Sequence, residues 1–469
     1  MFSFLYHIAN LQLLSIRTWL NYKRYGKVDV ELVKRCREQI VNSGFVVIKL
    51  CQWSLPRLNM MYSLNGVEWY KELEKVYDEC NVHPDGYTKE IYNLTMGIDF
   101  DSKYELKEVV ASGSIGQVHK IRDKLTGEIK AIKCKHPGTN MQYKVSIFTI
   151  RIFSYFLTKV KRIHYRIFPI ELEAFYDSLT TQVYLSNESE NIIKMGQKFK
   201  DEKYIIIPEL YENSDDIIVM DYIEAVKYQD LDISTIERYK VCMLLYLSIK
   251  KMIIIDKFIH GDLHKGNWKV IVDNSDLKCK YRLVLYDMGF CFTIENIDKL
   301  YESLEENNID KIIESLPVVA TDVFSRPDEF CKKLISEKLL STLTRPICNE
   351  NLIINVITVC KNNGFILKGH FITMAILMEQ TKCIFDEYLL NNDTDVNNKK
   401  TEDSKEIFEN VLLKKDFPEI ISFCNTYGIF KEMVEYYEKK IEDSDLKRSG
   451  IFESCDFSDI LDSSLAIMD

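Results

Sequence analysis

The chain has 469 residues, a formal net charge of −10 and an apolar fraction of 46%. This length exceeds the usual size of one hydrophobic core, so we expect two lobes or domains. The acidic balance argues against a nucleic-acid-binding protein, which normally presents a basic face. The 13 cysteines form no C-x-x-C pair and have no zinc-ligand spacing with histidine, so they indicate reduced, buried thiols in an intracellular, reducing compartment.

The first twenty residues are apolar and precede Lys23, Arg24 and Lys27. This composition fits an organelle transit signal, a membrane-surface helix, a signal anchor or a helix packed on the main body, and we prefer the last interpretation. No internal stretch is long and apolar enough to predict a membrane span. Residues 146–168 are apolar but interrupted by basic residues, which predicts an amphipathic helix.

Helical spacing of apolar residues predicts helices over 30–42, 67–76 and 88–94, with a turn at 83–86. An apolar run over 44–54 contains Lys49 and Gln52. A buried lysine is costly unless it is paired. Lys49 therefore either reaches solvent or meets an anion.

A strand, a turn of small residues and a second strand follow from residue 104, in the pattern A-x-G-x-x-G-x-V. Such a turn lets backbone N–H groups approach phosphates. The next strand ends in Lys133, where a kinase keeps the lysine that holds the α- and β-phosphates. We expect the nucleotide to be bound here by Ala111, Ser112, Gly113, Ser114, Ile115, Gly116, Gln117, Val118, Ala131 and Lys133.

Residues 171–198 are predicted to be helical, with Glu188 and Asn191 on neighbouring turns. The apolar runs 204–208 and 216–220 are predicted to complete the sheet of the small lobe. Residues 221–224 then resemble a kinase hinge, so we expect Met220 and Tyr222 to bind the adenine end of the nucleotide.

In the stretch from His260 to Asn267, an Asp is followed five residues later by an Asn, the spacing of a kinase catalytic loop. An Asp-x-Gly follows at the end of an apolar strand over 281–286. Phosphoryl transfer needs a carboxylate near the attacking oxygen and oxygen ligands for Mg²⁺. Asp262 supplies the first, and Asn267 and Asp287 supply the metal ligands. We expect His260 and His264 to orient the loop, because imidazoles suit zinc better than magnesium.

No A-P-E motif or obvious activation-loop phosphosite follows Asp287, which speaks against a protein kinase controlled by loop phosphorylation. Helices are predicted from Ile297 onward and over 350–390. A polar linker over 391–406, two helices over 407–441 and an acidic tail from Glu442 complete the chain.

Four motifs resemble those of the UbiB-like, or aarF-domain, atypical kinase family. They are Ser114–His119, similar to the alanine-rich loop A-A-A-S-[IL]-G-Q-V-H; Lys49–Gln52, similar to K-x-G-Q; Glu188–Asn191, similar to the second half of E-L-D-x-x-x-E-A-x-N; and His260–Asn267, similar to H-x-D-x-H-P-G-N. The match spans roughly residues 31–292, with weaker similarity over 371–388.

The sequence departs from the family pattern at three places. Cys51 replaces the glycine of K-x-G-Q, and Gln182 stands where the first Glu of E-L-D belongs. A neutral glutamine cannot neutralise Lys133, so either Glu188 pairs with Lys133 or the lysine is held less firmly. In the loop, Ser112 and Gly113 replace two alanines, and we hypothesise that Gly113 loosens the family's restriction on phosphate placement.

The resemblance implies an α+β, two-lobed protein-kinase-like fold, with a helical N-terminal extension packed over the active site and extra C-terminal helices. We assign the extension with its K-x-G-Q-like motif to residues 1–100, the small lobe to 101–225, the large lobe to 226–395, and the C-terminal helices and acidic tail to 396–469. Lys49 would then lie near the phosphates.

The implied function is that of an atypical kinase or ATPase that uses ATP and Mg²⁺ in isoprenoid lipid or quinone metabolism. The implied catalytic residues are Asp262, Lys133, Lys49, Gln52 and Glu188, with Asn267 and Asp287 on the metal. A nucleotide-binding pseudokinase scaffold and an aminoglycoside- or choline-type phosphotransferase remain alternatives. Expected partners are a nucleotide, a lipid or isoprenoid small molecule and a membrane surface, but no nucleic acid. The N-terminus is the segment that would direct the chain to a membrane or an organelle.

Overall fold

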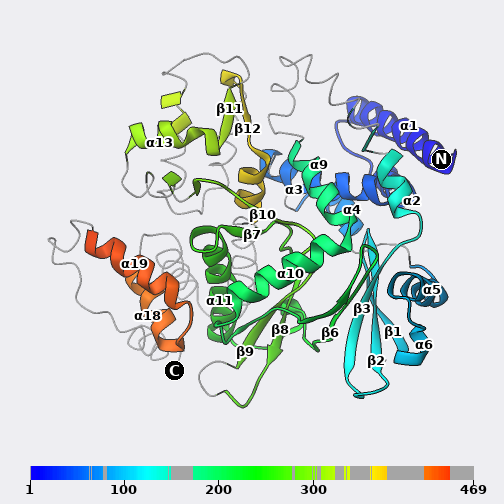
Figure 1. The fold of residues 1–469 in the computed structure, drawn as a ribbon. Helices are drawn as coiled ribbons and strands as arrows, with labels where there is room; N and C mark the ends of the chain where they lie inside the picture. Colours follow the sequence, from blue (N-terminus) through cyan, green and yellow to red (C-terminus); the bar gives the residue numbers. More distant parts are fainter. Residues whose placement is uncertain are drawn as a thin grey trace.

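The structure of the chain is a computed structural model (Figure 1). It describes residues 2–62, 64, 66–77, 82–145, 147, 148, 151, 173–276, 280–297, 299, 300, 303, 308–322, 332, 333, 335–337, 360, 362–377 and 417–443. Among these residues, no helix has both the length and the apolar character that crossing a membrane requires.

The N-terminal extension is helical, as predicted. Its elements are α1 (Phe2–Tyr25), α2 (Val30–Asn42), α3 (Phe45–Tyr62), α4 (Glu68–Glu74) and the 3₁₀ turn η1 (Lys75–Tyr77). The Asp29 side chain accepts a hydrogen bond from the Glu31 N–H and so caps the start of α2. A buried ion pair joins Arg37 of α2 to Glu72 of α4, with Nε and Oε1 3.0 Å apart. The extension is therefore held together partly by charge.

Two short helices and a five-stranded antiparallel sheet form the small lobe (Figure 1). The elements are α5 (Asp85–Met96), α6 (Phe100–Lys103), β1 (Tyr104–Ser112), β2 (Gly116–Asp123), β3 (Ile129–Lys135), β6 (Ile217–Asp221) and β5 (Leu210–Asn213), with strand order β1-β2-β3-β6-β5. Along β3 the side chains alternate between two faces. Ile132 and Cys134 pack in a core with Tyr92 of α5, which leaves Ala131 and Lys133 on the opposite face.

The large lobe is built around the buried helix α11 (Thr235–Ile254). Ser234 and Glu237 form a reciprocal capping box at its N-terminus. Two small sheets carry the predicted catalytic segments: β4-β9-β8 and β10-β7. Their strands are β4 (Ile205–Ile206), β7 (Phe258–His260), β8 (Trp268–Val272), β9 (Tyr281–Leu285) and β10 (Cys291–Thr293).

The remaining described elements are α9 (Glu173–Val183), α10 (Leu185–Phe199), η2 (Tyr228–Asp230), α13 (Ile309–Ser315), η3 (Leu316–Val318), β11 (Ala320–Asp322), β12 (Phe365–Leu367), α18 (Phe417–Tyr427) and α19 (Lys431–Asp443). The last two helices pack against each other at the C-terminal side of the molecule (Figure 1). Helix α10 packs on β5 and β6 of the small lobe, and α9 packs on α10 and α3. The fold is thus α+β and two-lobed, and the helical extension precedes the two lobes in the chain.

Three predictions of secondary structure were wrong in detail. The expected single helix over 171–198 is two helices, α9 and α10, because Tyr184 between them has an extended backbone. The run at 204–208 does not join the small-lobe sheet, since β4 pairs with β9 in parallel and Leu210–Asn213 takes the edge position instead. The expected all-helical stretch over 350–390 contains β12, which pairs with β11.

Some predictions lie outside the described residues. These are most of the amphipathic helix at 146–168, the linker at 391–406 and the acidic tail beyond Asp443. The domain boundaries stay predictions.

Candidate active site

Three elements distant in sequence bring one amine and two carboxylates into contact. The Nζ of Lys133, on β3, lies 2.7 Å from both carboxylate oxygens of Glu188, on α10. The same Nζ lies 2.9 Å from Oδ1 of Asp287, just after β9. Glu188 is the most deeply buried of the three, with 3% of its side chain exposed. Of the two alternatives for Lys133, the structure therefore shows the pairing with Glu188.

The charges in this cluster set its protonation. Burial would lower the pKa of Lys133, but the charges of Asp287 and Glu188 outweigh it and raise that pKa above its ordinary value. Burial would raise the pKa of Asp287, yet Lys133 and Lys49 hold it well below its usual range. Burial raises the pKa of Glu188. Asp287 is consequently the ionised carboxylate that a cation would meet first.

Asp287 has a left-handed backbone, with φ of +55°. Residues other than glycine adopt this conformation at a cost, although aspartate is among the more tolerant ones. The turn that follows is fixed from α10, because the Asn191 side chain donates to the Met288 carbonyl at 2.8 Å. The strained backbone and this clamp together fix the direction of the Asp287 carboxylate.

Asn267 is tied to both neighbouring segments. Its side-chain N–H₂ donates to the Asp262 carbonyl at 2.7 Å, and its own carbonyl accepts from the N–H of Tyr286 at 2.8 Å. Its amide nitrogen is thereby engaged in the loop, which leaves the amide oxygen as the group that can serve a metal. No cluster of three or more His, Cys, Asp or Glu side chains able to hold a metal occurs within the described ranges.

The catalytic-type loop is organised by His260 and by a glycine. The His260 ring bonds to the Tyr286 carbonyl at 2.9 Å and accepts from the Asp262 N–H at 3.2 Å. A Cβ on Gly261 would lie 2.5 Å from the Phe290 ring, so no larger residue fits there without movement. The His264 ring accepts from the Gly266 N–H at 3.0 Å. Both histidines thus hold the loop, the role predicted for them.

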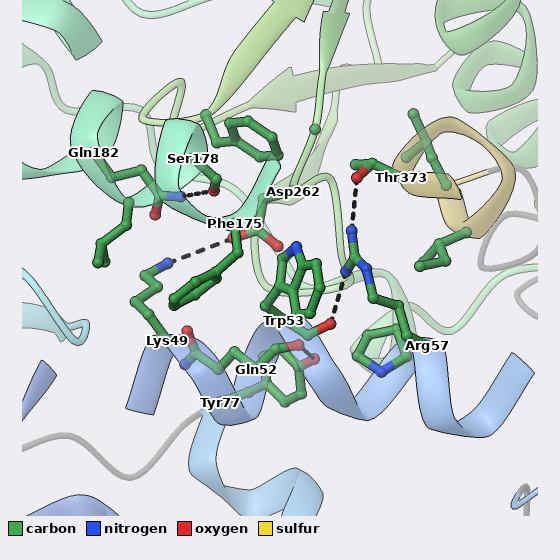
Figure 2. Close-up of a pocket in the computed structure, with 16 residues that line it drawn as sticks. Lys49, Gln52, Trp53, Arg57, Tyr77, Phe175, Ser178, Gln182, Asp262 and Thr373 are labelled. Atoms are coloured by element: carbon green, nitrogen blue, oxygen red, sulfur yellow. Dashed lines mark hydrogen bonds and ion pairs between the residues drawn. The ribbon is translucent and has the colours of Figure 1, made fainter. Parts of the chain in front are cut away.

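Helix α3 closes the site from the extension. The Lys49 Nζ lies 3.6 Å from Oδ2 of Asp262 (Figure 2). Gln52 donates to the Val76 carbonyl at 3.2 Å, and the Tyr77 hydroxyl donates to the Gln52 carbonyl at 2.7 Å. The Tyr77 ring also packs edge-on against His264. Lys49 accordingly meets an anion, whereas the Gln52 amide bonds to the extension rather than to the catalytic loop.

The phosphate-type turn contains one glycine that is sterically required and one that is not. A Cβ on Gly116 would lie 2.8 Å from the Cys134 carbonyl, so only glycine lets β2 approach β3 this closely. A Cβ on Gly113 would meet nothing closer than 3.6 Å. Ser114 and the buried Ile115 form the rest of the turn between β1 and β2.

The Gln117 side chain points into the small lobe rather than toward a nucleotide. It is fully buried, accepts from the His83 N–H at 2.8 Å and bonds to the His119 ring at 2.9 Å. The predicted role of Gln117 in binding a nucleotide is therefore open only to its backbone. Its side chain belongs to a chain of three histidines that runs from His83 to His136, whose ring bonds to the Gly113 carbonyl at 3.0 Å.

The other predicted nucleotide residues lie on the sheet behind this turn. Ala111 and Ser112 end β1, Val118 pairs with Lys133, Ala131 pairs with Met220, and Tyr222 follows β6 beneath the ammonium of Lys120. Ala131 and Met220 are nearly buried and belong to the main core. Val118, Lys133, Ala131 and Met220 therefore share one side of the sheet, whereas Ser112 pairs with Gln117 and lies on the opposite side.

A pocket on the other side of Asp262 was not predicted. It has a volume of about 60 Å³ and lies between α3, α9 and the catalytic-type loop (Figure 2). Gln182, considered above as a partner for Lys133, lines this pocket and bonds to Ser178 instead. Arg57 lines it as well, eight residues after Lys49 on the same face of α3. Continuing the helical spacing from Lys49 through Gln52 and Trp53 would have identified Arg57.

The two-lobed fold, with a lysine and an acidic residue on facing elements and an Asp, Asn and Asp around the cleft, defines a protein-kinase-like chain. The chain belongs to the family described as the ABC1 atypical kinase-like domain, whose model matches residues 75–314. This assignment confirms the resemblance to the UbiB-like family.

Curated relatives agree with this family. Protein ACTIVITY OF BC1 COMPLEX KINASE 8, chloroplastic, from Arabidopsis thaliana is 24% identical over 334 residues, covering 64% of this chain and 41% of the relative. A probable protein kinase UbiB from Shewanella woodyi is 26% identical over 297 residues, covering 62% and 52%. The chain thus spans about half of these relatives or less. The solved structure of Rv3197 with erythromycin, from Mycobacterium tuberculosis, has a TM-score of 0.42 at 15% identity and covers 70% of this chain and 87% of that one.

Proposed function

We propose that this protein binds ATP with Mg²⁺ and transfers the γ-phosphoryl group to a small acceptor or to water. The observation that carries the proposal is the contact of Lys133 with both Glu188 and Asp287, together with Asp262 on the neighbouring loop. Kinases need this lysine to be positioned by one carboxylate while the other is directed at the metal.

The residues present fit the two groups. The turn between β1 and β2 presents backbone N–H groups beside Gly113, where the structure leaves room. Asp287 and Asn267 offer carboxylate and amide oxygens, the donors that Mg²⁺ prefers. When bound, Mg²⁺ neutralises charge on the β- and γ-phosphates. Met220 and Tyr222 would flank the adenine, and Lys133 would bond to the α- and β-phosphates.

Asp262 is the group that would take the proton. The acceptor oxygen forms a bond to the γ-phosphorus, the bond from that phosphorus to ADP breaks with its electron pair leaving on ADP, and the acceptor proton passes to Asp262. Lys49, 3.6 Å from Asp262, orients this carboxylate before the reaction. Gln52 supports Lys49 by fixing α3 to η1.

Asp287→Asn tests this proposal. Wild type should show a rise in melting temperature with Mg-ATP and should release phosphate from ATP. Asp287→Asn keeps the shape of the side chain but removes the metal-binding charge, so we expect release to fall by about a hundredfold or more. Nucleotide binding without turnover in wild type would instead favour a pseudokinase scaffold.

Acceptor assays separate the remaining alternatives. Phosphorylation of aminoglycosides or choline would favour a small-molecule phosphotransferase, and phosphorylation of peptides would favour an ordinary protein kinase. A link to isoprenoid lipid or quinone metabolism is supported by the family and by the UbiB name of the relative from Shewanella woodyi. Comparison of lipids and metabolites with active protein and with Asp287→Asn would test that link.

We also propose that α1 contacts a membrane surface. One side of α1 packs on α2, where His7 bonds to Gln39 at 2.8 Å. Elsewhere on α1, Leu13, Ile16 and Trp19 are more than half exposed, and the helix ends in Lys23 and Arg24. Apolar side chains next to basic ones suit an anionic lipid surface. Flotation with anionic vesicles should fail for Leu13→Glu combined with Trp19→Glu if α1 is the contact.

A further inference from the structure

Arg57 is a buried cation that has no ion-pair partner among the described residues. Only 4% of the surface of Arg57 is exposed to solvent. One terminal nitrogen donates to the Trp53 carbonyl at 2.7 Å, and the other donates to the Thr373 hydroxyl at 2.8 Å. Both acceptors are neutral. Its Nε has no hydrogen-bond partner, and no carboxylate pairs with it, anywhere in the part of the chain that the structure describes.

Burying a guanidinium without an anion is costly. Burial lowers the pKa of Arg57 to about 9, and the nearby Tyr77 and Asp262 offset this only partly. The matched case is Arg37, equally buried, which has Glu72 as its partner at 3.0 Å. A buried charge of this kind persists when something else supplies the missing anion.

The pocket beside Arg57 has the charge and the size for a small anion. Its lining includes two cations, Lys49 and Arg57, and one carboxylate, Asp262. Lys49 is already paired with Asp262, which leaves the charge of Arg57 as the surplus. The volume of about 60 Å³ corresponds to about two water molecules. This admits a single carboxylate or phosphate group and excludes a whole lipid or peptide.

We propose that this pocket binds an oxyanion, a carboxylate or phosphate group, through Arg57, and that the group belongs to the molecule that receives the phosphoryl group beside Asp262. The second half rests on the proposed function. Figure 2 shows the geometry: Arg57 and Lys49 project from one face of α3 toward the loop that carries Asp262. An acceptor anchored by its anion on Arg57 would have its hydroxyl next to the carboxylate that takes the proton.

The tryptophan beneath Arg57 reports on the pocket. The guanidinium lies 3.9 Å from the centre of the Trp53 ring, so an anion that binds Arg57 changes the surroundings of that ring. The full chain is titrated with sodium phosphate and, separately, with sodium acetate, at constant ionic strength set with sodium chloride. We expect a saturable change in tryptophan fluorescence with at least one of the two.

Variants locate the signal. It should disappear in Trp53→Phe, weaken at least tenfold in Arg57→Gln, and remain in Arg37→Gln, which removes an equally buried arginine of the extension. Arg57→Lys keeps the charge but not the planar fork, and should bind more weakly than wild type. Unfolding in urea checks that each variant is folded before it is titrated.

The outcomes separate the two proposals. Response to phosphate alone or to acetate alone identifies which oxyanion the acceptor carries. Where acetate changes the fluorescence, it should also lower phosphate release from ATP with the same half-point, because it occupies the place of the acceptor, and Arg57→Gln should abolish that effect. A titration that is absent, or unchanged in Arg57→Gln, overturns the oxyanion site, whatever the rate of ATP turnover. Anion binding in a protein that never turns over ATP overturns the proposed function and leaves the site.

Discussion

Lys133, on β3, and Arg57, on α3, are two cations with little solvent exposure, and the groups that surround them differ in charge. Lys133 contacts two carboxylates of the protein itself, and their charges raise its pKa. Arg57 contacts two neutral oxygens, and burial lowers its pKa. Lys133 therefore has anionic partners in the absence of a ligand, whereas Arg57 has only neutral hydrogen-bond acceptors among the described residues.

This difference in charge partners shows which side of the site has its side chains paired in the absence of a ligand. On the Lys133 side, Asp287 can turn to a metal while Glu188 keeps the lysine in place. On the Arg57 side, the energetic cost of the buried charge is recovered only when an anion enters. Under the proposed function, the nucleotide side would therefore be preorganised, and the acceptor side would be completed by its ligand.

The largest expected effect is on stability, and it tests this contrast directly. Lys133→Met leaves Glu188 buried without a counter-charge and should lower the free energy of unfolding by about 3 kcal/mol. Arg57→Met removes an uncompensated charge together with two hydrogen bonds, so these effects offset each other and the loss should stay below about 1 kcal/mol. Urea unfolding of both variants measures the difference. Equal losses would show that the two cations are not held differently.

The phosphate-type turn gives the next effect. Gly116→Ala pushes a methyl group against the Cys134 carbonyl and should destabilise the protein by about 1–3 kcal/mol. In Gly113→Ala the new methyl group makes only an ordinary van der Waals contact, 3.6 Å from the Gly116 carbonyl, and should change stability by no more than about 0.5 kcal/mol. If Gly113 loosens phosphate placement, however, Gly113→Ala should still alter nucleotide affinity or turnover. No change in either would refute that hypothesis.

A further effect concerns pH and the histidines behind the turn. Burial lowers the pKa of His83 from 6.5 to about 4, and burial also lowers the pKa values of His119 and His136. Between pH 6.5 and 4 the unfolded chain binds more protons at these rings, so stability should fall as the pH falls. The slope is at most about 1.4 kcal/mol per pH unit for each histidine.

Urea unfolding across this pH range measures the slope. His83→Gln should make it shallower, while His7→Gln on α1 serves as the matched substitution. An identical slope in all three proteins would remove the histidine chain as its source.

Patterns along the chain predicted the parts of the site that lie on regular elements or in short motifs. Asp262, Asn267 and Asp287 follow from spacing, and Lys133 follows from the strand pattern. Glu188 stayed one of two alternatives, because distance along a helix does not say which residue faces another element. Whether those residues act as proposed is for the experiments to decide.

What sequence did not predict depends on tertiary contacts. The break at Tyr184 separates α9 from α10, and it directs Gln182 into the pocket beside Ser178 rather than toward Lys133. Likewise, β4 left the small-lobe sheet because β9 offered it a parallel partner. The helical spacing from Lys49 marks Arg57 as a residue of the same face of α3, but the lack of a carboxylate partner among the described residues is a tertiary feature that no residue pattern records.

The hydroxyl of Tyr77 donates to the Gln52 carbonyl of α3, and its ring packs against His264. One aromatic side chain therefore connects the extension to the catalytic-type loop. A kinase-like core expressed without residues 1–77 would lose both contacts of Tyr77, along with Lys49 and the wall of the pocket that α3 forms. Under the proposed function, such a truncated core would have an open cleft and should accept a broader range of substrates than the full chain.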